Sequence, residues 1–324
     1  RESRMHTHPA WRATRLVSKS AHRELPTHPT PHRNQGTLGS AYSQKARAIV
    51  PVSVPPLHHP TTPILQLFPL PPLRLLISND DGIHAPGIQA LYGALHELGE
   101  THVVAPDAEQ SAVGHAITIS NPIKCRKVEK NGRFFGHAVG GTPADSVKLA
   151  VTALLKERPD LLVSGINLGP NAGISVIYSG TVSAATEGTI LGIPSMAVSL
   201  NTFVNPIWDT PARIARDLVQ KALKRGLPEE TLLNVNVPNL PFDEIKGYRV
   251  TRMGRSRYNE VFHQRADPRG NIYYWMDGEL EQLGEAADTD LKALEAGFVS
   301  LTPIWFDLTH DAVLPDFRKV WEES

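Results

Sequence analysis

The sequence predicts an α/β fold with a doubly wound, mostly parallel sheet and a smaller, β-rich C-terminal extension. Short runs of branched apolar residues alternate with segments whose apolar residues recur at helical spacing, which is the pattern of a buried parallel sheet covered by helices. Several of these runs end in polar or glycine-rich loops, as strands of open α/β sheets do at their ligand-binding edge. After Pro238 the strand-like runs become shorter, and this change predicts the extension.

The first predicted strand and the loop after it carry the most information. Leu75–Ile77 is a run of branched apolar residues typical of a buried strand, and Asn79-Asp80-Asp81-Gly82 follows it. Pro86 stands where a helix would begin, and apolar residues recur at helical spacing from Ile88 to a stop at Gly99. Two adjacent carboxylates are therefore expected at the carboxyl end of a buried strand.

The remaining elements follow along the chain. Asn131-Gly132 between two strand-like runs predicts a hairpin, which we expect to be an insertion into the β/α alternation. Thr142-Pro143 predicts a helix start with Thr142 as its N-cap. The other expected strands are 101–105, 123–128, 133–139, 160–164, 193–200, 232–237, 248–252, 271–275 and 298–304, and further helices are expected after the turn at 178–185 and at 210–226, 290–295 and 311–321.

Charge and composition exclude several classes of function. Residues 1–73 carry nine Lys/Arg and two Asp/Glu, whereas the rest of the chain has a net charge of −7, so no nucleic-acid polymer is expected as a partner of the folded part. Cys125 is the only cysteine, which excludes a disulfide framework and a thiolate zinc site. No apolar run reaches about 18 residues, so no membrane span is expected.

Residues 1–73 differ from the rest in composition. They hold twelve of the 27 prolines and seven of the 14 histidines, with no sustained helical or strand period, which predicts an unfolded or loosely attached segment. Three interpretations stay open: a targeting peptide, a natural disordered tail, or upstream sequence outside the working protein. We expect a cytoplasmic protein, with organelle targeting by this segment as the alternative.

The adjacent aspartates point to a metal. Two close carboxylates repel unless one keeps its proton or a cation lies between them, and a hard cation such as Mg²⁺ prefers oxygen ligands. The alternative is that Asp80 caps the helix and Asp81 is a solvated turn residue. Further oxygen- and amide-bearing side chains follow other predicted strands, and a doubly wound sheet would gather them at one edge: Ser111, Asn167, Asn171, Ser179 and Thr181.

Together these groups favour phosphate chemistry. Two carboxylates, a hydroxyl and an amide oxygen would give a hard metal a partial shell, and the metal would polarise a phosphoryl oxygen. The hydroxyl-rich helix start near Ser179 suits a phosphate dianion, with an ordinary Ser or Thr N-cap as the alternative. The chain has no Gly-x-Ser-x-Gly elbow, no P-loop and no Gly-x-Gly-x-x-Gly opening its first helix, which disfavours serine-nucleophile, ATP-driven and nicotinamide enzymes.

Five ordered motifs resemble the SurE survival-protein family of 5′-nucleotidases. They are Ser78-Asn79-Asp80-Asp81-Gly82-Ile83-His84-Ala85-Pro86-Gly87, Val104-Ala105-Pro106-Asp107, Gly141-Thr142-Pro143-Ala144-Asp145, Val163-Ser164-Gly165-Ile166-Asn167-Leu168-Gly169-Pro170-Asn171 and Tyr178-Ser179-Gly180-Thr181-Val182-Ser183-Ala184-Ala185. The resemblance covers about 74–324. It implies a Rossmann-like core at about 74–240, a β-rich extension at about 241–324 used in subunit exchange, and a homodimer or homotetramer.

The resemblance also implies an activity and a set of site residues. Family members hydrolyse nucleoside monophosphates with a divalent cation, here Mg²⁺ or Mn²⁺. The metal ligands would be Asp80, Asp81, Ser111 and Asn167, and the two aspartates would be the catalytic residues. The phosphate site would comprise Asn79, Gly82, Ser179, Gly180 and Thr181. His115 and Asn171 are candidate substrate contacts, with a structural or solvated histidine as the alternative for His115.

Other functions stay open at this stage. A broad-specificity 3′-nucleotidase or exopolyphosphatase would use the same metal and phosphate groups, and a nucleotide-binding stress protein would keep the pocket without turnover. A haloacid-dehalogenase-type phosphatase needs Asp-x-Asp after the first strand, and here the aspartates are adjacent. We expect metal-activated water, or one of the two aspartates, to attack the phosphorus, and no motif identifies the general acid.

Overall fold

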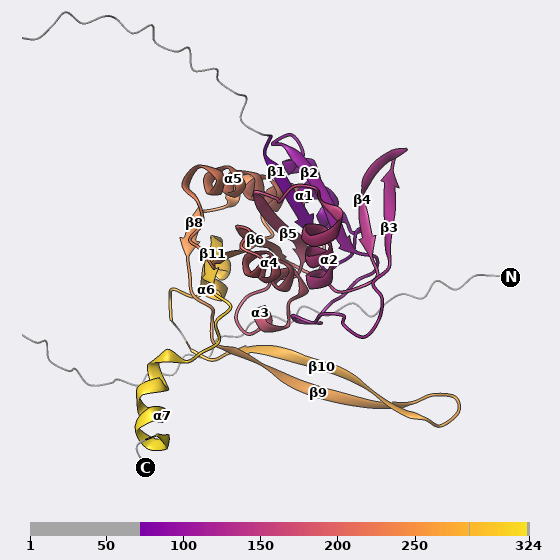
Figure 1. The fold of residues 1–324 in the computed structure, drawn as a ribbon. Coiled ribbons are helices and arrows are strands. Elements are labelled where there is room, and N and C mark those ends of the chain that lie inside the picture. The colour runs from indigo at the N-terminus through magenta and orange to yellow at the C-terminus, as the bar shows by residue number, and fades with distance from the viewer. Residues whose placement is uncertain (1–71, 285, 323–324) are drawn as a thin grey trace, which may run out of the picture. The chain divides into compact units, whose positions relative to one another are not determined.

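A nine-stranded sheet forms the centre of the protein, with helices on both of its faces (Figure 1). The computed structural model describes residues 72–284 and 286–322, and these belong to one compact unit spanning 71–324. The strand order is β3-β4-β2-β1-β5-β6-β7-β11-β8. This architecture confirms the predicted α/β class with a mostly parallel sheet. The prediction for residues 1–71 falls outside the described residues.

Five parallel strands make the middle of the sheet: β1 (Arg74–Ser78), β2 (Glu100–Pro106), β5 (Leu161–Leu168), β6 (Ser195–Asn201) and β7 (Leu232–Pro238). The chain runs from β1 outward to β2 on one side, and returns to place β5 on the other side of β1. The carboxyl ends of β1 and β5 therefore form a topological switch point, the place where open α/β sheets bind ligands.

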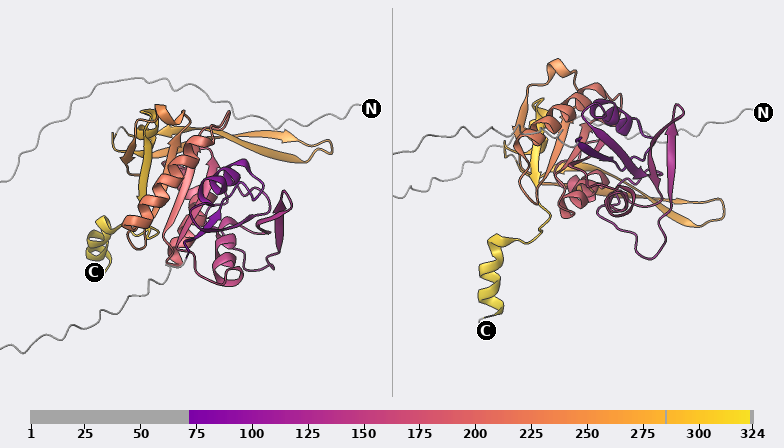
Figure 2. Two further views of the ribbon diagram at one scale, coloured as in Figure 1. Left: turned by 90° about the horizontal axis from the view of Figure 1, so that it is seen from above. Right: turned by 45° about the horizontal axis from the view of Figure 1, so that its top comes forward.

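Two helical layers cover the sheet (Figures 1 and 2). On one face lie α1 (Pro86–Leu95) and α5 (Asp209–Arg225), and on the other lie α2 (Pro143–Leu149) and α4 (Gly180–Ile190). Leu75 and Ile77 pack into the core beneath α1 and α5, whereas Leu76 packs into the core beneath α2 and α4. Successive side chains of a strand point to opposite faces of the sheet, so β1 contributes residues to the core on each face. This explains why Leu75–Ile77 is apolar at every position.

The predicted hairpin is present and, as expected, stands between β2 and α2, where it interrupts the β/α alternation of the chain. It consists of β3 (Cys125–Lys130) and β4 (Arg133–Val139), and β4 pairs in parallel with β2. Ala138 and Val139 are buried at this junction. The pair therefore extends the central sheet at its edge, because the apolar end of β4 needs a neighbour strand to cover it.

The C-terminal part is rich in strands, as predicted, and its strands divide between two sheets. β8 (Tyr248–Val250) and β11 (Val299–Ile304) join the central sheet, whereas β9 (Ser256–Ala266) and β10 (Ile272–Gln282) form a separate antiparallel pair. The sequence did not predict β9, and it predicted β10 only as 271–275. Both strands are exposed almost throughout, so no buried face imposes a period-2 pattern.

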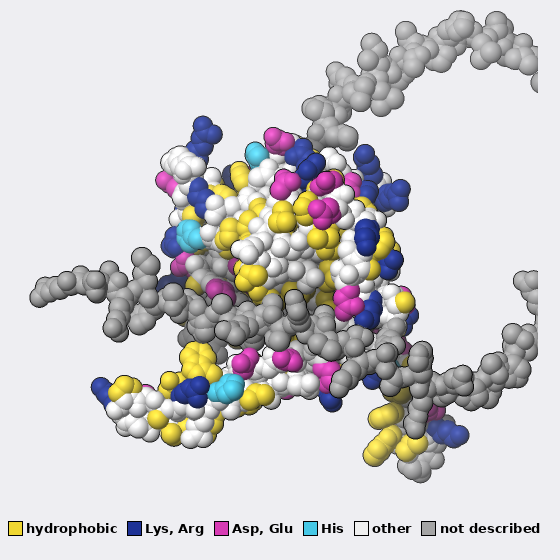
Figure 3. All heavy atoms as spheres, turned by 180° about the vertical axis from the view of Figure 1, so that it is seen from behind, with side chains coloured by type: hydrophobic (Ala, Val, Ile, Leu, Met, Phe, Trp, Pro, Cys, Tyr) yellow, Lys and Arg dark blue, Asp and Glu magenta, His cyan; other side chains and the backbone are white. Residues whose placement is uncertain are grey.

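Exposed apolar side chains gather on this β9–β10 hairpin (Figure 3). The helices α6 (Asp290–Glu295) and α7 (Leu314–Trp321) follow it, and the short α3 (Ser175–Tyr178), which the sequence did not predict, precedes α4. None of the helices in the described part of the chain combines the length and the hydropathy that crossing a membrane requires.

A pair of glycines in α1 tests how closely this helix must approach the sheet. A Cβ on Gly87 would lie 1.9 Å from the carbonyl oxygen of Ile166, whereas a Cβ on Gly93 would meet nothing within 4 Å. We expect Gly87→Ala to destabilise the protein by about 1–3 kcal/mol through overpacking. The matched change Gly93→Ala should be neutral or stabilising by up to about 1 kcal/mol. Urea unfolding of both variants measures the difference, and equal midpoints would contradict the close approach.

Candidate active site

The two aspartates lie at the switch point, directly after β1. Asp80 is 5 % exposed, and the Thr181 hydroxyl at the start of α4 donates a hydrogen bond to its Oδ1. Gly180 makes this approach possible, because a Cβ there would lie 2.7 Å from the Cβ of Asp80. The N-terminus of α4 and the acidic pair are thus in direct contact, although the sequence separates them by about a hundred residues.

Burial disfavours the charged form of both aspartates. Burial raises the pKa of Asp80 above its usual range, against the opposing hydrogen bond from Thr181. Burial, and then the charge of Asp80, raise the pKa of Asp81 to about 7. Two carboxylates with raised pKa values in one site are typical of a functional position, because a stable fold would avoid this cost.

The loop that carries Ser111 is attached to the acidic pair through its backbone. Gln110 N donates to the Asp80 carbonyl oxygen at 2.8 Å, and the Ser111 hydroxyl donates to Glu109 Oε1 at 2.6 Å. The charge of Glu109 raises the pKa of both Asp80 and Asp81. The sequence analysis did not identify Glu109. Its position, two residues before Ser111 in a loop that follows a strand, could have indicated a place in the site.

Asn167 lies at the end of β5, beside the acidic pair. Its amide nitrogen donates to the Gly169 carbonyl oxygen at 2.7 Å, which leaves the amide oxygen as an acceptor. The neighbouring Leu168 N–H faces Asp81 Oδ2 at 3.4 Å. Asn171 lies deeper, where its amide donates to Ser199 Oγ and its carbonyl oxygen accepts from Asn234 and Asn236. The structure therefore gives Asn171 a buried bonding network of its own.

Of the predicted phosphate-binding residues, Gly180 and Thr181 lie against Asp80. Ser179 is the N-cap of α4, and its hydroxyl accepts a hydrogen bond from Val182 N at 3.0 Å. The Asn79 amide donates to the Gly82 carbonyl oxygen at 2.9 Å, while its buried Oδ1 has no hydrogen-bond donor within the described residues. Gly82 has φ +92°, a conformation that favours glycine, and it turns the chain back toward the Ser111 loop.

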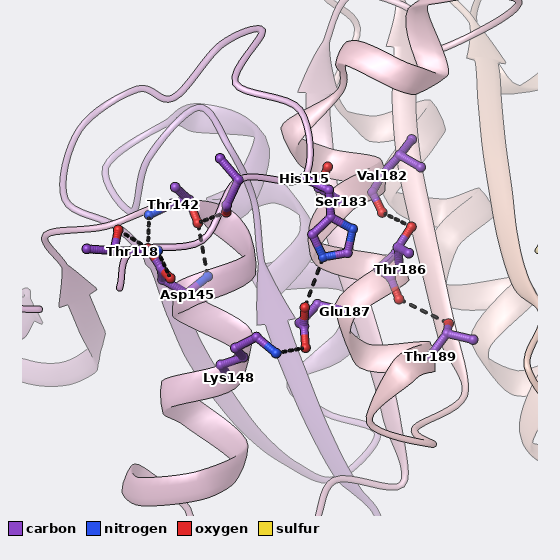
Figure 4. Close-up of polar contacts among 12 residues, drawn as sticks. His115, Thr118, Thr142, Asp145, Lys148, Val182, Ser183, Thr186, Glu187 and Thr189 are labelled. Carbon is purple, nitrogen blue, oxygen red and sulfur yellow. Dashed lines mark hydrogen bonds and ion pairs between the residues drawn. The ribbon is translucent and has the colours of Figure 1, made fainter. Parts of the chain in front are cut away.

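His115 lies four residues after Ser111 and contacts a group that sequence reasoning missed. Its Nε2 is 2.9 Å from Oε2 of Glu187 on α4, and Lys148 on α2 reaches the other oxygen of the same carboxylate (Figure 4). Glu187 could have been identified from the sequence as the single acidic residue in a helix of small residues.

The donor set fits a hard cation. Within the described ranges 72–284 and 286–322, no group of three or more His, Cys, Asp or Glu side chains could hold a metal. A cation at this site would therefore depend on the two carboxylates together with the hydroxyl of Ser111 and the free amide oxygen of Asn167, all of them oxygen donors. A cation beside the two carboxylates would offset the burial that raises their pKa values.

Comparison with known proteins agrees with this geometry. Residues 75–260 match the family model described as Survival protein SurE. The chain is 50 % identical over 247 residues to a protein named 5′-nucleotidase SurE from Syntrophobacter fumaroxidans, covering 76 % of this chain and 99 % of that protein. A protein of the same name from Syntrophomonas wolfei is 48 % identical over 252 residues, covering 78 % and 96 %.

A solved structure gives the same result. The crystal structure of the Sure protein from Aquifex aeolicus matches this chain with 44 % sequence identity and a TM-score of 0.66. The match covers 76 % of this chain and 99 % of the Aquifex chain.

The raised pKa of Asp81 makes stability depend on pH in a predictable direction. Because the folded-state pKa of about 7 lies above the unfolded value, ionising Asp81 opposes folding, and its contribution to stability is lost as the pH rises from about 4 to about 7. In EDTA, Asp81→Asn should therefore gain stability over the wild type between pH 5 and pH 8, on the order of 1–2 kcal/mol. Guanidinium unfolding at each pH measures this gain.

Asp145 offers a control of opposite sign. Burial would raise its pKa, but hydrogen bonds from Thr118 and Thr142 outweigh burial and lower it. Asp145→Asn should therefore be less stable than the wild type at pH values above about 4, and this difference in stability should shrink as the pH falls below about 4. If the free energy of unfolding of Asp81→Asn differed from that of the wild type by the same amount at every pH, Asp81 would be solvated and the prediction would be wrong.

Proposed function

The chain belongs to the SurE survival-protein family, and on that premise we propose that it hydrolyses nucleoside 5′-monophosphates to nucleoside and phosphate with a divalent cation, Mg²⁺ or Mn²⁺. The observation that carries the proposal is the contact between the buried acidic pair after β1 and the N-terminus of α4. This contact would bring a bound cation next to a bound phosphate dianion, and a metal-assisted phosphomonoesterase needs both.

Each residue has a distinct part in the proposed reaction. Asp80, Asp81, Ser111 and Asn167 would hold the cation, which supplies charge stabilisation for the phosphoryl oxygens when it is bound. Thr181 fixes the orientation of the Asp80 carboxylate, and the Leu168 N–H does the same for Asp81. The start of α4 would bind the non-bridging oxygens of the ester, because a helix N-terminus is a favourable place for an anion.

Burial of the site residues supports the proposed electrostatic stabilisation of the phosphate ester. Asp80, Ser179 and Thr181 are all almost fully buried, so charges there interact more strongly than they would in bulk water. Electrostatic stabilisation by groups that are already oriented is the largest contribution to many phosphoryl transfers. Replacement of one such group should therefore reduce the rate more than it changes substrate binding.

We also propose that the chain assembles as a homodimer or a homotetramer. Aromatic and apolar side chains on the β9–β10 hairpin and on α7 support this proposal, because large exposed apolar patches commonly mark contact surfaces. They include Tyr274 (58 % exposed), Trp275 (62 %), Phe317 (59 %) and Trp321 (74 %).

Removing the Asp80 charge tests the activity and its metal dependence together. Asp80→Asn should lower the rate of phosphate release from AMP by more than about tenfold. Even groups that only support a metal ligand cost about tenfold or more when they are removed, and loss of a direct ligand should cost more. Mn²⁺ should raise the melting temperature of the wild type by mass action and should raise that of Asp80→Asn much less. Asp217→Asn is the control, because Asp217 is a paired carboxylate on α5, on the other face of the sheet. Unchanged turnover in Asp80→Asn would discard the mechanism.

A substrate panel tests the substrate class. We expect 5′-mononucleotides to be hydrolysed faster than 3′-mononucleotides, p-nitrophenyl phosphate and short polyphosphate, and EDTA to stop release from all of them. Faster release from a 3′-nucleotide or from polyphosphate would replace the 5′-nucleotidase assignment with a broader phosphatase. No release with any metal would leave a nucleotide-binding protein.

A further inference from the structure

Glu187 is a buried carboxylate that the proposed reaction does not use. It is the only charged residue of α4, and its side chain is 2 % exposed. His115 Nε2 lies 2.9 Å from its Oε2, and Lys148 Nζ lies 2.5 Å from its Oε1 (Figure 4). Three separate parts of the chain therefore meet at one carboxylate: α4, α2 and the loop after β2.

The electrostatics of this cluster favour an ionised Glu187. Burial alone would raise the pKa of the carboxyl, but hydrogen bonds from His115 and Lys148 and the attraction of Lys148 outweigh it, and the pKa is lowered. Removing one partner of a buried charged hydrogen bond is costly, because the remaining group loses both its partner and its water. Losing the bond from His115 would therefore leave one oxygen of this buried carboxylate without a partner.

His115 belongs to a loop that is docked at several points. Gly114 N donates to the Tyr178 carbonyl oxygen at 3.0 Å, directly before the phosphate turn. Further along, Thr118 donates to Asp145 on α2 through its backbone N–H at 2.9 Å and through its hydroxyl at 2.6 Å. Along the chain, Ser111 lies between these anchors and Gln110, whose N–H donates to the Asp80 carbonyl oxygen. The left side of Figure 4 shows the Asp145 anchor, and the centre shows the Glu187 anchor.

We propose that His115 and Glu187 are positioning residues that lock the Ser111 loop onto α4. The start of α4 contacts Asp80, and its last turn carries Glu187, so the helix links the acidic pair to the anchor of the loop. The lock sets the Ser111 hydroxyl at a fixed place relative to Asp80 and to the phosphate turn. The inference rests on the proposed function, since it takes Ser111 as a cation ligand.

The geometry favours this role over a substrate contact for His115. The Nε2 atom of the ring is engaged by a carboxylate that lies on the helix and away from solvent. The same buried carboxylate also binds Lys148, so His115 is part of a bonded cluster between α2 and α4 and is not a free side chain available to substrate. The side chain of His115 is 33 % exposed, so its replacement leaves the core intact and gives an interpretable variant.

Three variants test the lock. His115→Ala removes the donor, whereas His115→Gln keeps an N–H near the position of Nε2. Asp217→Asn is the control, because Asp217 is likewise shared by two partners, Lys221 and Tyr248, but lies on α5. Hydrogen exchange is measured on the metal-free protein, and Mn²⁺ affinity is measured by calorimetry without substrate.

We expect His115→Ala to speed exchange at the Gly114 amide by about tenfold or more, while the Thr118 amide stays protected through Asp145. Mn²⁺ affinity should fall about tenfold, the range found when groups behind a metal ligand are removed. His115→Gln should recover most of both properties, and Asp217→Asn should change neither.

The outcomes separate this inference from the proposed function. Exchange and Mn²⁺ affinity in His115→Ala within twofold of wild type would overturn the lock, whatever the activity. A raised KM for AMP with unchanged Mn²⁺ affinity would also overturn it and would make His115 a substrate contact. Loss of protection and of Mn²⁺ affinity would support the lock even if the wild type released no phosphate from AMP, a result that would overturn only the proposed function.

Discussion

Two carboxylates buried side by side at the end of β1 are the constraint on which the rest of the site depends. Each lies where its charge is poorly solvated, so burial raises both pKa values. The fold offsets part of this cost with the Thr181 hydroxyl and the Leu168 N–H. The remaining cost favours a cation, which Ser111 and Asn167 would help to hold in the proposed reaction.

Close backbone packing makes this convergence possible. Gly180 lets α4 approach the side chain of Asp80, and Gly87 lets α1 approach the carbonyl of Ile166, just before Asn167. At both positions a methyl group would displace an element that carries a proposed ligand. Packing and chemistry are therefore coupled at these two positions, because each leaves no room for a side chain next to a residue that we propose to bind metal or phosphate.

The Ser111 loop shows how a long connection can be held in place without regular structure. Its docking points lie on α2 and α4, through Asp145, Thr142 and Glu187. The Thr142 hydroxyl donates to the carbonyl oxygen of Ala116 in the loop, whereas Asp145 and Glu187 are carboxylates with lowered pKa values, so both stay ionised at neutral pH. Bonds to ionised acceptors are stronger than bonds between neutral groups, and a few of them can replace a hydrophobic core beneath a loop.

The sequence by itself determined the fold class, most of the central strands and the acidic pair. Apolar runs such as Leu75–Ile77 and glycine or proline boundaries are local signals, and a resemblance in ordered motifs named the ligand candidates. The sequence did not reveal β9, the pairing of β4 with β2, or Glu109 and Glu187. Only the tertiary structure decided these features, because exposed strands carry no period, and because a contact such as His115 to Glu187 joins residues 72 positions apart that no local pattern relates.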